Sequence, residues 1–186
     1  MIRFILGGAR SGKSRYAEQL ASDGGKEVVY IATAQAYDDE MQTRILHHKK
    51  QRPANWTTIE EALNLDKVLS NNSNITNCIL IDCLTLWLTN LLCVNYDVTL
   101  AKQALLDALR QSQSDIIIVS NETGMGVVPM GELTRRYCDE VGWLHQEIAA
   151  LADQVVLMVA GIPVVIKEVC NGQSPVKIDP TNNPMS

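Results

Sequence analysis

The chain lacks several features that would point to common classes of protein. Its five cysteines are odd in number and form no C-x-x-C pair, so we expect buried thiols in a reducing cytoplasm and no structural zinc site. The net charge of −5 provides no basic surface for nucleic acid or anionic lipid. The apolar runs are only as long as strands, so membrane insertion is not expected. Residues 1–6 are too few for a signal peptide before the first motif.

The remaining composition is typical of a globular α/β protein. A chain of 186 residues with 46% hydrophobic residues can bury one full core, and no linker or repeat divides it. Residues 1–186 are therefore predicted to form a single domain, with a loose tail from about residue 171. Unbroken apolar runs alternate with helical patterns, which predicts a mostly parallel sheet with helices on both faces.

The expected elements follow from these patterns. Strands are predicted at residues 2–6, 27–33, 78–82, 115–121, 154–160 and 162–167. Helices are predicted at residues 14–20, at about 38–52 and at 84–92. Two further helices are predicted from apolar stripes, one formed by Leu100, Ala104, Leu105, Ala108 and Leu109, the other by Leu133, Tyr137, Val141, Leu144 and Ile148.

A phosphate-binding motif lies between the first predicted strand and the first helix. The sequence from Gly7 to Ser14 matches G-x-x-x-x-G-K-[ST], the P-loop, through Gly7, Gly8, Ala9, Arg10, Ser11, Gly12, Lys13 and Ser14. Backbone N–H groups and the helix dipole would surround the phosphates of a nucleoside triphosphate, ATP or GTP. Lys13 would reach the β- and γ-phosphates, and the Ser14 hydroxyl would hold Mg²⁺. The alternative, a chance glycine-rich turn, is disfavoured by the strand-then-helix context.

Ligands of parallel α/β sheets bind beyond the carboxyl ends of the strands, so the residues that follow each strand are candidates. Asp82 ends an apolar strand and resembles a Walker B aspartate that would hold Mg²⁺, although such an aspartate can also cap the next helix. Thr33 follows another strand and is a weaker candidate, since it can simply end that strand. Residues 121–129 form a glycine-containing loop that indicates substrate contact or a lid, or else a long turn with an exposed Met125.

Three histidines are few, which makes the adjacent pair His47 and His48 informative. One imidazole could act as a nucleophile toward a phosphate, and the alternative is that both are ordinary helix residues. On a helix over residues 38–52, His48 lies within roughly 60° of the apolar Met41 and Ile45. His47 lies roughly 100° from His48 and away from that stripe, so it is the better candidate for a nucleophile. The third histidine, His145, is expected to be structural.

Several motifs occur in order along the chain and together resemble one family. They are Gly7–Arg15, Tyr30–Thr33, Asp38–Met41, Arg44–Lys49, Arg52-Pro53 with Trp56, Thr89–Leu92 and Asn121–Pro129. The sequence resembles the bifunctional adenosylcobinamide kinase / adenosylcobinamide-phosphate guanylyltransferase family of cobalamin assembly. The resemblance extends from residue 1 to about Lys167. The paired histidines and the Asn-Glu-x-Gly-Met-Gly loop are far more specific than the P-loop.

The resemblance implies two reactions. In the first, the aminopropanol hydroxyl of adenosylcobinamide takes the γ-phosphate of ATP or GTP. In the second, GTP gives its GMP to a histidine, which aligns with His47, and adenosylcobinamide phosphate then attacks to form adenosylcobinamide-GDP. The resemblance also implies a RecA-type core and a homotrimer that holds the corrinoid between subunits. The family's nucleotide contacts correspond to residues 7–14, Ala32, Thr33, Ala34, His48, Lys49, Lys50, Gln51, Glu60 and Asp82.

Two other functions stay open on the sequence alone. The first is a simple P-loop kinase of a small alcohol, in which both neighbouring histidines are structural and no covalent nucleotide adduct forms. The second is a RecA-like nucleotide-dependent switch, which would hydrolyse nucleotide under the control of a partner. The run from Lys49 to Arg52 is likewise open, since it suits either a solvated helix end or contacts to phosphate.

Overall fold

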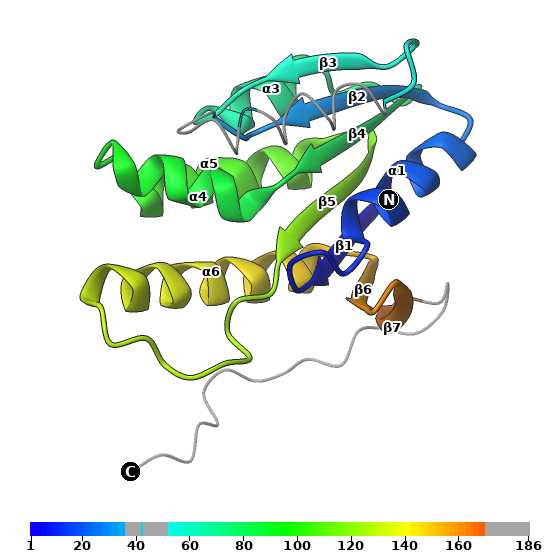
Figure 1. Ribbon diagram of the computed structural model, residues 1–186. Helices are drawn as coiled ribbons and strands as arrows, with labels where there is room; N and C mark the ends of the chain where they lie inside the picture. Colours follow the sequence, from blue (N-terminus) through cyan, green and yellow to red (C-terminus); the bar gives the residue numbers. More distant parts are fainter. Residues whose placement is uncertain (36–41, 43–51, 170–186) are drawn as a thin grey trace.

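The computed structural model describes residues 1–35, 42 and 52–169, which fold around one sheet (Figure 1). The strands are β1 (Ile2–Gly7), β2 (Glu27–Ala32), β3 (Thr57–Glu60), β4 (Asn77–Asp82), β5 (Asp115–Asn121), β6 (Gln154–Val159) and β7 (Ile162–Glu168). The helices are α1 (Lys13–Asp23), α3 (Leu65–Asn71), α4 (Leu84–Cys93), α5 (Val98–Gln111) and α6 (Glu132–Leu151). The helix predicted over residues 38–52 falls almost entirely outside the described residues, and so does the predicted tail.

The sheet is parallel except at one edge. Among the described residues, seven strands follow the order β3-β2-β4-β5-β1-β6-β7, and only the β6–β7 pair is antiparallel. The central strands β1, β4 and β5 carry apolar residues on both faces, which is why both faces must be covered. The predicted α/β class with a mostly parallel sheet is confirmed.

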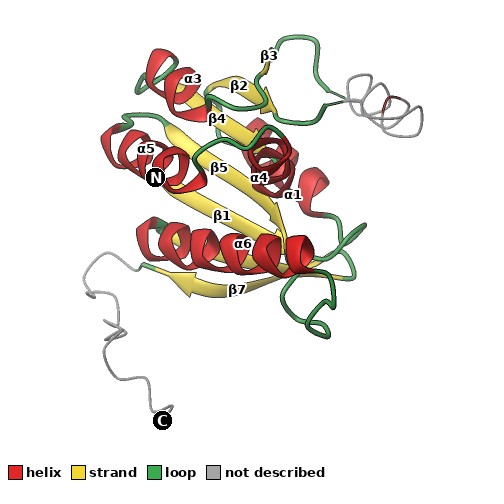
Figure 2. Cartoon of the chain, turned by 90° about the vertical axis from the view of Figure 1, so that its left-hand side faces the viewer, coloured by secondary structure: helices red, strands yellow, loops and turns green. Residues whose placement is uncertain are grey.

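Helices cover the sheet on both sides: Figure 1 shows α1 on one side and α4, α5 and α6 on the other. Figure 2 looks onto the side of α4, α5 and α6. On one face, Ala17 and Ala21 of α1 pack against alternate strand residues such as Ile5 and Leu80. On the other face, α3, α4, α5 and α6 build a larger core around Trp87. Successive strand residues point to opposite faces, so neighbouring positions of one strand enter different cores. No described helix is long and apolar enough to cross a membrane.

Two residues of the predicted helical stripes are not buried. Leu100 is 63% exposed and Leu133 is 67% exposed, so assigning them to apolar stripes was wrong. Leu100 lies on the solvent side of α5, since Val98 and Ala101 in the same turn are buried in the core. Leu133 lies in the first turn of α6, where residues 132–136 are all exposed. In α5 the buried side chains are instead Val98, Ala101, Lys102, Leu105, Leu106, Ala108 and Leu109.

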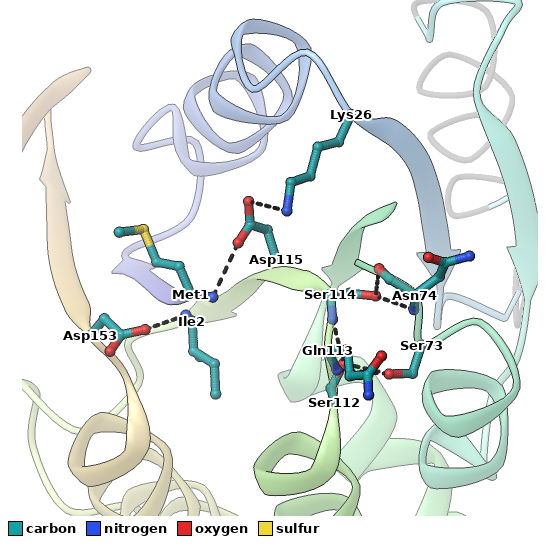
Figure 3. Close-up of polar contacts among 10 residues, drawn as sticks. All are labelled: Met1, Ile2, Lys26, Ser73, Asn74, Ser112, Gln113, Ser114, Asp115 and Asp153. Atoms are coloured by element: carbon teal, nitrogen blue, oxygen red, sulfur yellow. Dashed lines mark hydrogen bonds and ion pairs between the residues drawn. The ribbon is translucent and has the colours of Figure 1, made fainter. Parts of the chain in front are cut away.

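Polar contacts close the amino-terminal edge of the sheet (Figure 3). Asp115 pairs with the Met1 amino group at 3.1 Å and with Lys26 Nζ at 3.0 Å. Asp153 accepts a hydrogen bond from the Ile2 amide at 2.7 Å. Ser114 Oγ accepts from the Asn74 amide and donates to its carbonyl. These polar groups bind one another at the amino-terminal edge. We therefore expect ligands at the carboxyl-terminal edge, where β1 leads into the P-loop.

Candidate nucleotide-binding and transfer site

The P-loop connects β1 to α1 through backbone conformations that require glycine. Gly12 precedes α1 with φ 93°, in the left-handed region. A Cβ on Gly7 would lie 2.6 Å from the carbonyl oxygen of Met158, because β6 runs directly beside β1. The loop is fixed at its far side, where the Gly161 amide donates to the Ser11 carbonyl at 3.0 Å. The backbone amides at the start of α1 therefore stand at the carboxyl edge of the sheet.

Lys13 brings a positive charge into this loop. Its Nζ donates to the Gly8 carbonyl at 2.6 Å, and the residue is only 7% exposed. Burial lowers the pKa of Lys13, while Cys83 and Asp82 act in the opposite direction. Strand register places the carboxyl ends of β4 and β1 at one sheet edge, because Asp82 pairs with Val119 of β5 and Gly7 pairs with Asn121 of β5. A cation held over a phosphate-binding loop is suited to stabilise phosphoryl transfer.

Asp82 is oriented by a tyrosine from the neighbouring strand. The Tyr30 hydroxyl donates to Asp82 Oδ2 at 2.9 Å. Burial, together with the charge of Asp82, raises the pKa of Tyr30 far above its ordinary value, so the phenol stays a hydrogen-bond donor. The second carboxylate oxygen of Asp82 and the half-buried Ser14 hydroxyl are the oxygen donors that Mg²⁺ prefers. These residues therefore fit the metal that the motif implies.

A cation–aromatic cluster borders Asp82. The Arg52 guanidinium lies 3.6 Å from the centre of the Tyr30 ring, and Trp56 stacks on the same tyrosine with ring centres 6.3 Å apart. Within the described part of the chain, Nε and one terminal nitrogen of Arg52 are buried without a hydrogen-bond partner. Burial and the negative charge of Asp82 raise the pKa of Glu18, and the positive charge of Arg52 lowers it. The sequence patterns assigned no role to Glu18, and Tyr30 stood only within a family motif. The lone tyrosine in an aliphatic strand was the available signal for a role of its own.

Thr33 is completely buried and supports the turn after β4. Its hydroxyl donates to the Cys83 carbonyl at 2.7 Å and accepts from the Cys83 amide at 2.8 Å. The Thr33 amide donates to the Asp82 carbonyl, and the Thr33 carbonyl accepts from the Asn90 side chain at 2.8 Å. All the polar groups of Thr33 are thus engaged within the protein, and they fix the position of Asp82.

A second carboxylate lies beside the P-loop. The Glu122 amide donates to the Gly7 carbonyl at 3.0 Å, so Glu122 directly extends the pairing of β5 with β1. Glu122 Oε1 accepts from the Gly124 amide at 2.6 Å, which shapes the loop that follows. The middle of this loop is strongly exposed, with Met125 77% and Val127 96% accessible. An apolar, exposed segment at the ligand edge suits contact with a large substrate.

With this geometry established, similarity to known proteins identifies the family. The family described as cobinamide kinase / cobinamide phosphate guanyltransferase (CobU) matches residues 3–166. The chain belongs to the CobU family. It is 55% identical over 165 residues to the Pseudomonas aeruginosa bifunctional adenosylcobalamin biosynthesis protein CobP, covering 88% of this chain and 95% of that relative. It is also 41% identical over 182 residues to the Salmonella typhimurium CobU protein, covering 90% of this chain and all of that relative.

The CobU family assignment defines the activity. The protein is a bifunctional enzyme, a cobinamide kinase and cobinamide phosphate guanylyltransferase of cobalamin nucleotide-loop assembly. The resemblance inferred from the sequence motifs is confirmed. A solved structure of a Pyrococcus horikoshii protein superimposes with a TM-score of 0.54 at 6% identity, covering 91% of this chain and 87% of that one, which supports the fold alone.

The described CobU-family fold brings several of the predicted site residues together. The carboxyl edge of the sheet holds the P-loop, residues 32–34 (Ala32, Thr33 and Ala34) and Asp82. Glu60 pairs with Ala32 at the same edge. Glu60 is exposed at the end of β3. The remaining predicted residues lie outside the described part of the chain: His47, His48, Lys49, Lys50 and Gln51.

Proposed function

We propose that both activities use nucleotide bound at the P-loop edge, with ATP or GTP as donor in the kinase step and GTP in guanylyl transfer. The observation that carries this proposal is Lys13, a nearly buried cation folded over the loop at the sheet edge where Asp82 ends β4. The amides of Gly8 to Ser14 would bind the phosphates, and Lys13 would stabilise the charge that develops during transfer. Ser14 and Asp82 would hold Mg²⁺, which neutralises phosphate charge when bound.

In the kinase step, the terminal hydroxyl of the aminopropanol arm of adenosylcobinamide attacks the γ-phosphorus. A bond forms between that oxygen and phosphorus, and the bond to the bridging oxygen of the nucleoside diphosphate breaks. The hydroxyl proton leaves as the new bond forms. The P-loop edge supports this step through positioning and electrostatic stabilisation, which account for most of the catalysis of phosphoryl transfer.

In the guanylyl step, His47 is the proposed nucleophile. One imidazole nitrogen attacks the α-phosphorus of GTP, pyrophosphate leaves, and a phosphoramidate with GMP results. A phosphate oxygen of adenosylcobinamide phosphate then displaces the histidine and forms adenosylcobinamide-GDP. We assign further nucleotide contacts to Ala32, Ala34, Glu60 and residues 48–51. The predicted contact of Thr33 is not kept, because Thr33 is completely buried and its polar groups all bind within the protein. The support is family membership and the position of Ala32 and Glu60 at the ligand edge.

We further propose that the enzyme works as a cytoplasmic homotrimer. A corrinoid is large relative to a domain of 186 residues, and a groove between subunits would hold it. The exposed apolar loop from Glu122 to Pro129 is a suitable contact surface for such a ligand. The described cysteines, Cys78, Cys83, Cys93 and Cys138, are free thiols, which suits a reducing compartment.

Substitution of Lys13 tests the use of the P-loop directly. Lys13→Ala should reduce cobinamide phosphorylation by about 10²- to 10³-fold, because it removes transition-state charge without removing core packing. Labelling of the protein by GTP should fall as well if one site serves both steps. Lys26→Ala, a lysine at the opposite edge of the sheet, is the matched control and should retain activity. Near-normal phosphorylation by a folded Lys13→Ala protein would overturn the assignment.

A further inference from the structure

Glu122 has a special position relative to the P-loop strand. β1 has two neighbours in the sheet, β5 and β6. Ala160 and Gly161 follow β6, whereas Asn121 and Glu122 lie at and beyond the end of β5. Because the Glu122 amide bonds to the Gly7 carbonyl at 3.0 Å, this carboxylate-bearing residue is held beside the first glycine of the P-loop. Among the described residues it is the carboxylate that directly follows a strand adjacent to β1.

A buried histidine lies behind this carboxylate. His145 Nδ1 lies 3.9 Å from Glu122 Oε2, and His145 Nε2 lies 2.8 Å from Ser120 Oγ. Ser120 is completely buried, and the imidazole packs edge-on against the Phe4 ring with centres 5.4 Å apart. Burial lowers the pKa of His145, although Glu122 opposes this effect, so the ring is neutral at neutral pH. If Ser120 donates to Nε2, the ring proton sits on Nδ1 and faces Glu122.

Each oxygen of the Glu122 carboxylate has a neighbour, one at hydrogen-bond distance and one at 3.9 Å. The Gly124 amide holds Oε1 at 2.6 Å, and the imidazole lies next to Oε2. The Glu122 side chain is still 19% exposed, so it can meet a ligand at the sheet edge. Asp82, whose charge acts on Lys13, accepts a hydrogen bond from Tyr30 and suits the metal. The two carboxylates therefore have separate surroundings, which is the arrangement expected when they have separate roles.

We propose that Glu122 is the general base of the kinase step and that His145 is its positioning residue. As the cobinamide hydroxyl oxygen bonds to the γ-phosphorus, its proton passes to the Glu122 carboxylate, and the nucleoside diphosphate leaves with the electrons of the broken P–O bond. A carboxylate that accepts the substrate proton is a recurring part of phosphoryl-transfer sites. This inference rests on the proposed use of the P-loop edge for the kinase reaction.

The guanylyl step has no need of this base. Its acceptor is the phosphate of adenosylcobinamide phosphate, whose attacking oxygen is already ionised near neutral pH. Formation of the GMP adduct likewise involves no substrate hydroxyl. Loss of Glu122 should therefore separate the two activities, whereas loss of Lys13 should impair phosphate transfer more generally.

Glu122→Gln is the decisive variant, because the amide oxygen can still accept from Gly124 but cannot take a proton. We expect kcat for phosphorylation to fall by about 10²- to 10⁴-fold with KM for nucleotide nearly unchanged. Labelling from α-labelled GTP and GMP transfer to supplied adenosylcobinamide phosphate should persist. Glu27→Gln, at the amino-terminal edge, is the matched control. Phosphorylation within threefold of wild type in Glu122→Gln would overturn the proposal.

A double-mutant comparison tests the role of His145. His145→Phe keeps a ring against Phe4 and should lower the kinase kcat, by up to about 10²-fold, because Glu122 loses its alignment. If His145 acts through Glu122, the same substitution should cost less than about twofold in the Glu122→Gln background. Equal losses in both backgrounds would refute the positioning role; circular dichroism checks that each variant is folded. If the wild-type protein takes no label from α-labelled GTP, the proposed guanylyl mechanism fails. If the Glu122→Gln protein takes the label and also phosphorylates cobinamide at the wild-type rate, only the role of Glu122 as base is refuted.

Discussion

Replacing Gly7 by alanine should destabilise the protein for a specific steric reason. A Cβ at this position would lie 2.6 Å from the Met158 carbonyl oxygen and 2.7 Å from Ser11 Oγ, and the backbone has φ 154°. The Met158 carbonyl cannot move away easily, because Gly7 and Met158 are register partners of β1 and β6. Overpacking of this kind costs about 1–3 kcal/mol in the free energy of unfolding. For a domain of this size, Tm falls by about 2–4 °C for each kcal/mol.

Gly8→Ala provides the matched control, because nothing lies within 4 Å of a Cβ built on Gly8. Its free energy of unfolding should stay within about 0.5 kcal/mol of wild type. Urea unfolding followed by circular dichroism measures both variants without nucleotide, so an effect on ligand binding does not enter the comparison. Equal stability of Gly7→Ala and Gly8→Ala would refute the argument that β6 leaves no room for a side chain at Gly7.

The remaining predictions concern assembly and thiol reactivity. At micromolar concentration, light scattering should give the mass of a homotrimer, and a monomer would contradict the proposed assembly. Burial raises the pKa of Cys78 to about 11 and that of Cys83 to about 11, whereas Cys93 is exposed. At pH 8 iodoacetamide should therefore modify Cys93 in the folded protein, and Cys78 and Cys83 only after unfolding. Peptide mass spectrometry measures this order, and rapid modification of native Cys83 would contradict its buried position beside Lys13.

The strands and helices were predictable wherever the residues of one short segment had a clear strand or helix pattern of their own. The run Asp115–Asn121 is apolar and β-branched, and β5 has those bounds. In contrast, β3 has only four residues, pairs only with β2 and is largely exposed, so its sequence has no clear pattern. Helical periodicity placed Leu100 and Leu133 on the correct helices. It could not show that Leu100 faces solvent on α5 or that the whole first turn of α6 is exposed.

Some residues of the site could be predicted from neighbouring sequence, and others depend on contacts between distant segments. The P-loop and Asp82 are recognised from contiguous residues and the strand before them. The hydrogen bond from Tyr30 to Asp82 joins residues 52 positions apart, and that between Ser120 and His145 joins residues 25 apart. Strand order and helix packing create these pairs, so spacing along the chain could not predict them. His145 was expected to be structural; it is buried, but it also faces Glu122.

The claim that guanylyl transfer passes through His47 is tested most directly by labelling with GTP that carries the label in its α-phosphate. After denaturation, wild-type protein should retain the label, and the bond should break in acid and persist in alkali, as a phosphoramidate does. His47→Asn should take up no label yet keep most of its kinase activity, and the matched variant His48→Asn should retain some adduct. A labelled His47→Asn protein, an acid-stable adduct or an unlabelled wild-type enzyme would contradict the mechanism.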